Sequence, residues 1–149
     1  MIGFNHAAVG GLLATVLPLP LAIPVAVASH FVLDALPHYG IPHRLRDKSR
    51  FWKVVGIGDF AASWLILGCL SLFAWDRPDI FLCGLAAASP DFIWVLRILR
   101  HRSFDLSHNT SRFTRWHVAI QRYERPWGIY IELPLAVLLF WWLQRIATV

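Results

Sequence analysis

Charged side chains are scarce in this chain, and that scarcity excludes a water-soluble globular domain. Only 15% of the 149 residues are Asp, Glu, Lys or Arg, whereas 57% are hydrophobic and eight are Trp. The mean hydropathy is +0.53. A soluble domain of this length carries more charge and less apolar surface. We therefore expect residues 1–149 to form a single integral membrane domain of the all-α class.

Cysteine is also scarce, and this excludes a disulfide framework and a cysteine-based zinc site. The two cysteines, Cys69 and Cys83, lie in apolar runs without a Cys-x-x-Cys spacing, so we expect both in the core. No basic segment precedes the first apolar run and no convincing cleavage site follows it. A signal peptide is therefore not indicated, and we expect the whole chain to be mature.

Five apolar runs predict a polytopic helical bundle. They cover roughly residues 4–17, 20–36, 54–75, 80–98 and 127–145. The last three reach the length of about 20 residues that a helix needs to cross a bilayer. The first two are shorter and meet at a proline-rich turn, so we expect a thin or tilted hairpin that crosses. A short amphipathic helix is expected from Phe113 to Glu124, with one face formed by His117, Gln121 and Glu124.

The distribution of Lys and Arg predicts the orientation of the bundle. Twelve of the fourteen lie in or beside two connections, after the second and the fourth run, which leaves Arg77 and Arg145 for the opposite side. By the positive-inside rule, both connections and the N-terminus face the cytoplasm, and the C-terminus lies outside. Because the basic residues flank spans, the net charge of +5 is not a sign of nucleic-acid binding.

The most informative stretch runs from Ser29 to His38. His30 and Asp34 are four residues apart and therefore lie on one face of a helix. Pro37 interrupts the helix before His38, so His38 is expected near this pair rather than in line with it. Imidazole with carboxylate at this spacing is typical of a zinc or manganese site. The alternative is a hydrogen-bonded pair that stiffens the bundle.

Further ionisable side chains fall on the same side of the predicted bundle: His6, Asp59, Asp91 and His117. A carboxylate inside a membrane costs several kcal/mol unless it is paired or binds a metal, so each is a candidate functional group. Asp91 follows Ser89 and Pro90, where proline bends a helix. The alternatives are a helix-start carboxylate near Lys53 for Asp59, a polar interface residue for His6, and a lipid-facing surface helix for His117.

Three short motifs resemble those of a known family. They are Asn5-His6-Ala7-Ala8-Val9-Gly10, Ser29-His30-Phe31-Val32-Leu33-Asp34 with Gly40 after it, and Ser89-Pro90-Asp91. Together they resemble the small membrane-bound, metal-dependent hydrolases of bacterial inner membranes. They are more distantly similar to zinc-dependent phospholipase C, in which His-x-x-x-Asp supplies metal ligands. The resemblance implies a multi-helix membrane protein of the bacterial inner membrane with a metal-type site that includes His6, His30, Asp34 and Asp91.

These observations predict a metal-dependent hydrolase that acts at the cytoplasmic membrane face on a lipid or another membrane-associated phosphoester. The expected ligands of a divalent metal, zinc or manganese, are His6, His30, Asp34, Asp91 and His117. Asp59 is expected to act as a base or a further ligand, and His38 to protonate the leaving group. Two alternatives remain open. One is a proton- or cation-translocating protein with Asp34, Asp59 and Asp91 as its relay. The other is a non-catalytic assembly or haem-binding subunit in which His6 faces His30.

Overall fold

A computed structural model of the chain describes residues 1–40, 50–74, 76–101 and 111–147. These residues are mostly helical, which confirms the all-α class. The α-helices are α1 (Gly3–Val16), α2 (Leu19–Asp34), α4 (Arg50–Cys69), α5 (Pro78–Ala88), α6 (Phe92–His101), α7 (Arg112–Ile120) and α8 (Ile129–Ala147). Three shorter helices join them, namely η1 (Leu70–Ala74), η2 (Ser89–Asp91) and η3 (Pro126–Gly128), and two short strands are β1 (His38–Tyr39) and β2 (Glu124–Arg125).

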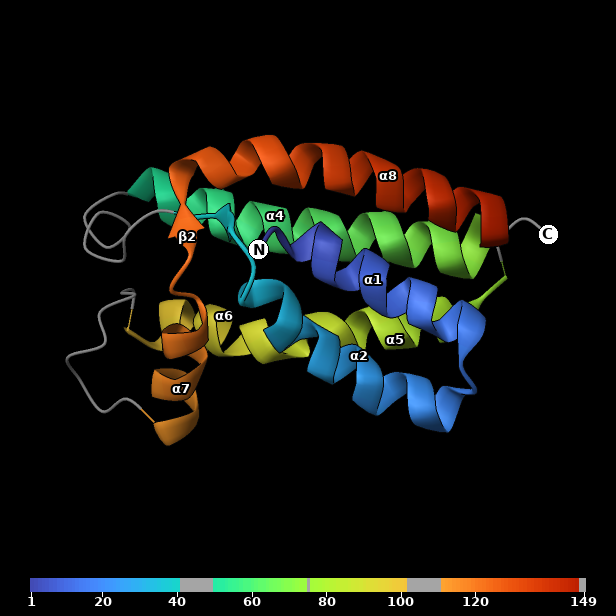
Figure 1. Cartoon of the computed structure of the whole chain (residues 1–149), viewed down its shortest axis with the longest axis horizontal. Coiled ribbons are helices and arrows are strands. Elements are labelled where there is room, and N and C mark those ends of the chain that lie inside the picture. Colours follow the sequence, from blue (N-terminus) through green and yellow to red (C-terminus); the bar gives the residue numbers. More distant parts are fainter. Residues whose placement is uncertain (41–49, 75, 102–110, 148–149) are drawn as a thin grey trace.

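Helix α1 lies at the centre of the bundle and packs against α2, α4, α5 and α8 (Figure 1). Small residues permit this close packing. A Cβ at Gly10 would collide with the carbonyl oxygen of Cys83 and would lie 2.6 Å from the Cβ of Ala87, both on α5. By contrast, a Cβ at Gly58 on α4 would meet nothing within 4 Å. Glycine at position 10 is therefore required by the contact between α1 and α5, whereas Gly58 does not contribute to helix packing.

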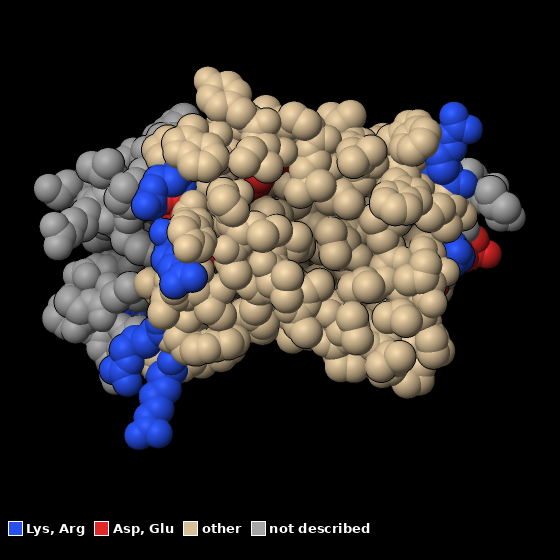
Figure 2. Space-filling model, viewed as in Figure 1, with Lys and Arg blue, Asp and Glu red and all other residues tan. Residues whose placement is uncertain are grey.

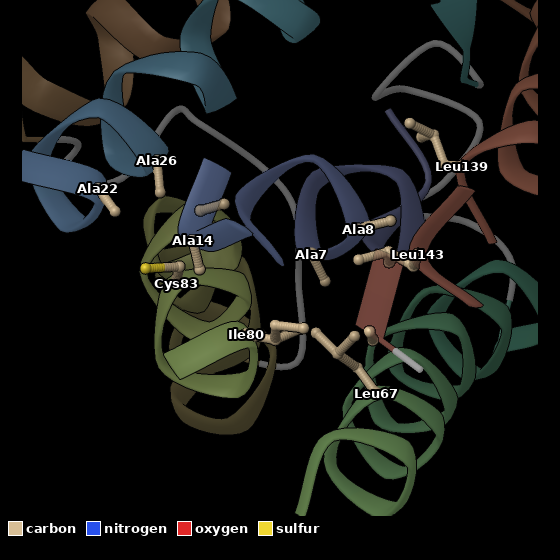
Figure 3. Close-up of a cluster of buried hydrophobic side chains, with 12 residues drawn as sticks. Ala7, Ala8, Ala14, Ala22, Ala26, Leu67, Ile80, Cys83, Leu139 and Leu143 are labelled. Carbon is tan, nitrogen blue, oxygen red and sulfur yellow. The ribbon is translucent and has the colours of Figure 1, made fainter. Parts of the chain in front are cut away.

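The buried core is built largely from alanine and a few larger side chains (Figure 3). Ala7 of α1, Ile80 of α5, Leu67 of α4 and Leu143 of α8 point toward one another where the four helices meet. The expectation that both cysteines lie in the core is half right. Cys83 is buried in this cluster, but Cys69 is exposed.

The structure corrects the predicted number of membrane spans. Among the described residues, two helical segments are long and apolar enough to cross a membrane, Pro78–Arg100 with 23 residues and Pro126–Ala147 with 22. The first two predicted spans correspond to α1 and α2, which have 14 and 16 residues. At a rise of 1.5 Å per residue they extend only about 21 and 24 Å, less than the bilayer core of about 30 Å. The apolar part of α4, Ile57–Leu72, is also too short.

Charge is concentrated at the two ends of the molecule (Figure 2). On the face shown in Figure 2, described arginine side chains gather at the end that carries α7 and β2 and at the end that carries the last turn of α8, and few charged atoms are visible on the surface between them. On α8 this surface exposes large apolar side chains, including Tyr130 at 81% and Val137 at 70%. An exposed apolar surface of this extent is typical of a membrane or protein interface.

The two strands fix the chain on either side of α7. Strand β1 pairs in parallel with β2, with His38 opposite Glu124 and Tyr39 opposite Arg125. Gly128, at the end of η3, lies so close to β1 that a Cβ at this position would collide with the backbone of His38. The expected helix through Glu124 is therefore wrong at its end, because α7 stops at Ile120 and Glu124 is recruited into a strand.

Candidate metal centre

Four side chains from three elements converge on one point, and we call them the His/Asp cluster: His30, Asp34, Asp91 and His117. Each offers one ligand atom, and these four atoms all lie within 4.8 Å of one another. Nε2 of His117 is 2.9 Å and Nε2 of His30 is 3.2 Å from Oδ2 of Asp34. His30, Asp34 and His117 are fully buried, whereas the Asp91 side chain is 19% exposed. The cluster is thus largely shielded from solvent, and Asp91 is its one partly exposed member.

Local sequence explains how each element delivers its ligand. His30 and Asp34 occupy the last turns of α2 at the predicted spacing of four residues. Asp91 ends η2, the short 3-10 turn that Pro90 introduces between α5 and α6. His117 lies on α7, whose start is capped by Ser111 accepting a hydrogen bond from the backbone N–H of Thr114 at 3.0 Å.

Aromatic contacts hold α7 against α2. The ring of Phe31 lies 4.7 Å from that of Trp116 and 5.5 Å from that of His117, measured between centroids. Phe113 also contacts Phe31, at 6.1 Å. Because Phe31 adjoins His30 in sequence, this packing brings the imidazole of His117 to the end of α2 where the carboxylate of Asp34 lies.

The hydrogen bond of His30 determines the chemistry of the cluster. Its Nδ1 lies 2.8 Å from the carbonyl oxygen of Ala87, which can only accept, so Nδ1 carries the proton. In neutral His30 the Nε2 atom therefore presents a lone pair to Nε2 of His117 at 3.1 Å and to the carboxylate of Asp34. Lone pairs that face one another repel unless a proton or a cation lies between them. This donor set, with a backbone carbonyl orienting one imidazole, fits a divalent metal such as zinc or manganese.

The two carboxylate oxygens of Asp34 face different groups. Oδ2 faces His117 and accepts a hydrogen bond from Nε2 of Gln121 at 2.8 Å. Oδ1 lies 3.1 Å from Nε2 of His6 and 2.9 Å from the backbone amine of Met1. His6, a predicted ligand, thus borders the His/Asp cluster on the far oxygen of Asp34 and is not among the four converging donors. Gln121 was predicted to share a face with His117, and it does reach the site.

The rings of His6 and His30 stack face to face. Their centroids are 4.0 Å apart and their planes differ by 22°. Two axial haem ligands instead direct a nitrogen of each ring at an iron between them. The stacked geometry therefore does not suit the haem pair that was considered for His6 and His30.

Two other carboxylates hold backbone amides near the cluster. Asp59, expected as a base or ligand, accepts the backbone N–H of Gly3 at 2.8 Å and is not among the four converging donors. Glu132 is fully buried and accepts backbone N–H groups of Ile2 and Tyr39, each at 2.6 Å. Sequence reasoning missed this role of Glu132, although a carboxylate within an otherwise apolar run was the available signal. Both carboxylates stabilise the N-terminal segment against α4 and α8.

His38 is buried beside the cluster in a neutral form. Its Nδ1 donates to the carbonyl oxygen of Leu36 at 2.8 Å, and its Nε2 has no hydrogen-bond partner among the described residues. Burial, together with the positive charge of the N-terminal amine, lowers the pKa of His38 from 6.5 to about 4. At neutral pH the side chain therefore presents a lone pair, which does not favour the expected role as a proton donor.

Part of the predicted basic region cannot be compared with the structure. His43, His108 and the basic residues from Arg44 to Lys48 lie outside the described residues, as does the side chain of His101. Arg112, Arg115, Arg122 and Arg125 are described and are exposed.

Comparison of the chain with protein-family models, with curated proteins and with solved structures gives no match. The resemblance carried by the three short motifs therefore stays a prediction. The geometry of the His/Asp cluster and the surface of the bundle carry the functional argument.

Proposed function

We propose that this chain is an integral membrane, metal-dependent hydrolase that acts at the cytoplasmic face on a lipid or another membrane-associated phosphoester. The observation that supports this most strongly is the convergence of His30, Asp34, Asp91 and His117 within 4.8 Å. Structural metal sites are closed by protein ligands, whereas catalytic sites keep an open position. Asp91, whose side chain is partly exposed, marks the side from which water or a substrate could approach a metal held by the cluster.

The four residues of the His/Asp cluster would hold the metal. A divalent metal bound there would supply Lewis acidity, which makes a water molecule more acidic and offsets negative charge on the oxygens of a phosphoester. The chain's own residues prepare the site. Ala87 orients the imidazole of His30, and Gln121 orients the carboxylate of Asp34. The buried Nε2 of His38 has no hydrogen-bond partner among the described residues, so it can accept a hydrogen bond from a water molecule or a substrate.

The membrane location has separate support. The segments Pro78–Arg100 and Pro126–Ala147 have the length and composition of spans, and α8 exposes large apolar side chains along its length. Exposed arginines at the end that carries α7 support a cytoplasmic location for this end, by the positive-inside rule. The His/Asp cluster, which includes His117 of α7, belongs to the same end.

A hydrolysis assay tests the proposal. The purified protein, supplied with Zn²⁺ or Mn²⁺, is incubated with a panel of phospholipids, and the release of water-soluble phosphoesters is measured. We expect metal-dependent release that falls at least about 100-fold in Asp91→Asn. The matched control is Asp79→Asn, which changes a carboxylate paired with Arg77 and should keep full activity. Equal rates in Asp91→Asn and wild type, or no metal-dependent release from any member of the panel, would contradict the proposal.

A further inference from the structure

We infer that the outer side of α7 and the segment that follows it dock anionic phospholipid headgroups and thereby hold the His/Asp cluster, on the inner side of α7, close to the headgroup layer. This inference deepens the proposed function and rests on it for the membrane location. We call this surface the arginine–aromatic face. It consists of Arg112, Phe113, Arg115, Trp116, Arg122, Tyr123, Arg125 and Trp127, all of which are exposed.

Helix α7 has two sides with different roles. Thr114 and His117 are buried, and His117 contacts Asp34 in the cluster. The neighbouring Arg115 is exposed, and Trp116, which contacts Phe31 of α2, still leaves 50% of its side chain exposed. One short helix therefore carries a candidate metal ligand inward and cationic and aromatic side chains outward.

The guanidinium groups of the arginine–aromatic face are available to an external anion. Among the described residues, no carboxylate forms an ion pair with Arg112, Arg115 or Arg122. Arg122 lies over the ring of Tyr123, with its guanidinium carbon 4.8 Å from the ring centroid. Arg125 donates only to backbone carbonyl oxygens of its own segment. Exposed charges of one sign attract a surface of the opposite sign.

The aromatic residues of this face favour binding to a lipid surface rather than to a soluble anion. Trp and Tyr are enriched where protein meets the headgroup layer, and Arg pairs readily with phosphate. Arginines close to an anionic leaflet each contribute about 1 kcal/mol to its attraction. Within the described part of the chain, the opposite end of the molecule offers fewer arginines to an anion, because Arg77 is paired with Asp79, which leaves Arg145 over the ring of Trp141. The number of unpaired arginines therefore favours the end that carries α7.

The thickness of α7 sets the distance between the arginine–aromatic face and the His/Asp cluster. A helix with its side chains is about 10–12 Å across. A phosphate held by Arg112 or Arg115 would thus lie within about one helix diameter of His117, on the opposite side of the same helix. An anionic phospholipid matches this surface, because it combines a negative charge with a phosphoester at the depth of the headgroups.

Lipid selectivity measured by electron paramagnetic resonance tests the inference. The full-length protein is reconstituted in phosphatidylcholine vesicles, and spin-labelled phosphatidylglycerol is compared with spin-labelled phosphatidylcholine at low and high salt. The variants are Arg115→Gln and the double variant Arg112→Gln/Arg115→Gln. The matched control is Arg145→Gln, which removes an exposed arginine from the other end.

We expect the wild type to prefer phosphatidylglycerol, and the double variant to lose at least about fivefold of this preference at low salt. High salt should weaken the preference, because exposed charges are screened. Arg145→Gln should behave as wild type, and circular dichroism should show all variants folded. No preference in the wild type, or an equal loss in Arg145→Gln, would overturn the inference. Metal content is measured on the same samples. A lipid preference in a protein that binds no metal would contradict the proposed hydrolase function but not the proposed lipid docking.

Discussion

His30 on α2 and His117 on α7 direct their Nε2 atoms at each other across 3.1 Å, although 87 residues separate them in the chain. The hydrogen bond from Nδ1 of His30 to Ala87 leaves a lone pair on its Nε2. Oδ2 of Asp34 lies 2.9 Å from Nε2 of His117 and 3.2 Å from Nε2 of His30, which completes a triangle of atoms that can each bind a metal. This relationship joins α2, α5 and α7 at one point, and it is the structural basis of the proposed metal centre.

Replacing Asp34 should destabilise the fold as well as the site. Its carboxylate is fully buried and contacts His6, His117 and Gln121. Because its partners would be left buried without a counter-charge, we expect Asp34→Asn to lower the free energy of unfolding by about 3 kcal/mol. Unfolding of the purified protein in detergent measures this. Asp79→Asn, which breaks a partly exposed pair with Arg77, should cost no more than about 1 kcal/mol, and similar losses in both would argue against the prediction.

The contact between α1 and α5 should be sensitive to a single methyl group. In Gly10→Ala the new Cβ would collide with the carbonyl oxygen of Cys83 and press on Ala87, whose own carbonyl orients His30. We expect a loss of about 1–3 kcal/mol in the free energy of unfolding and weaker metal affinity. Gly58→Ala is the matched control, because its Cβ would meet nothing within 4 Å. A stable Gly10→Ala variant with unchanged metal affinity would show that this close approach is wrong.

The free energy of unfolding should fall at acidic pH because His38 is buried in its neutral form. The pKa of His38 is lowered by burial to about 4 in the folded state, compared with 6.5 when exposed. Above pH 6.5 His38 is neutral in both states, so the folded state keeps its full stability. As the pH falls from 6.5 to 4, only the unfolded state gains the proton, and the free energy of unfolding falls by about 3 kcal/mol in total. Thermal unfolding of wild type and His38→Gln over this pH range measures the effect. The variant should show a flatter profile, and parallel profiles would be inconsistent with a buried neutral His38.

Local patterns predicted part of the site. The spacing of four residues placed His30 and Asp34 together, Pro37 indicated that α2 would end before His38, and Pro90 indicated a break before Asp91. These predictions succeeded because each depends on the backbone geometry of a few neighbouring residues. His117 was predicted from the sidedness of the basic connections, and the structure brings it to Asp34.

Long-range packing accounts for what the sequence did not reveal. The five predicted spans assumed that every apolar run meets lipid, but α1 is apolar because it is buried at the centre of the bundle. Asp59 was expected as a base or ligand and Glu132 was not singled out, because the backbone N–H groups that they accept lie far from them in the sequence. No sequence motif predicts that the carbonyl of Ala87 orients His30, because a backbone acceptor does not depend on the side chain.

Metal content is the most direct test of the central claim. Wild type, His117→Ala and Asp79→Asn are purified without chelators, equilibrated with Zn²⁺ or Mn²⁺, and separated from free metal before elemental analysis. We expect about one equivalent of metal in wild type and in Asp79→Asn, and a loss of at least about tenfold in affinity in His117→Ala. Chelation should lower the melting temperature of wild type and leave that of His117→Ala unchanged. A wild-type protein that binds no stoichiometric metal, or a His117→Ala variant that binds it equally well, would contradict the account.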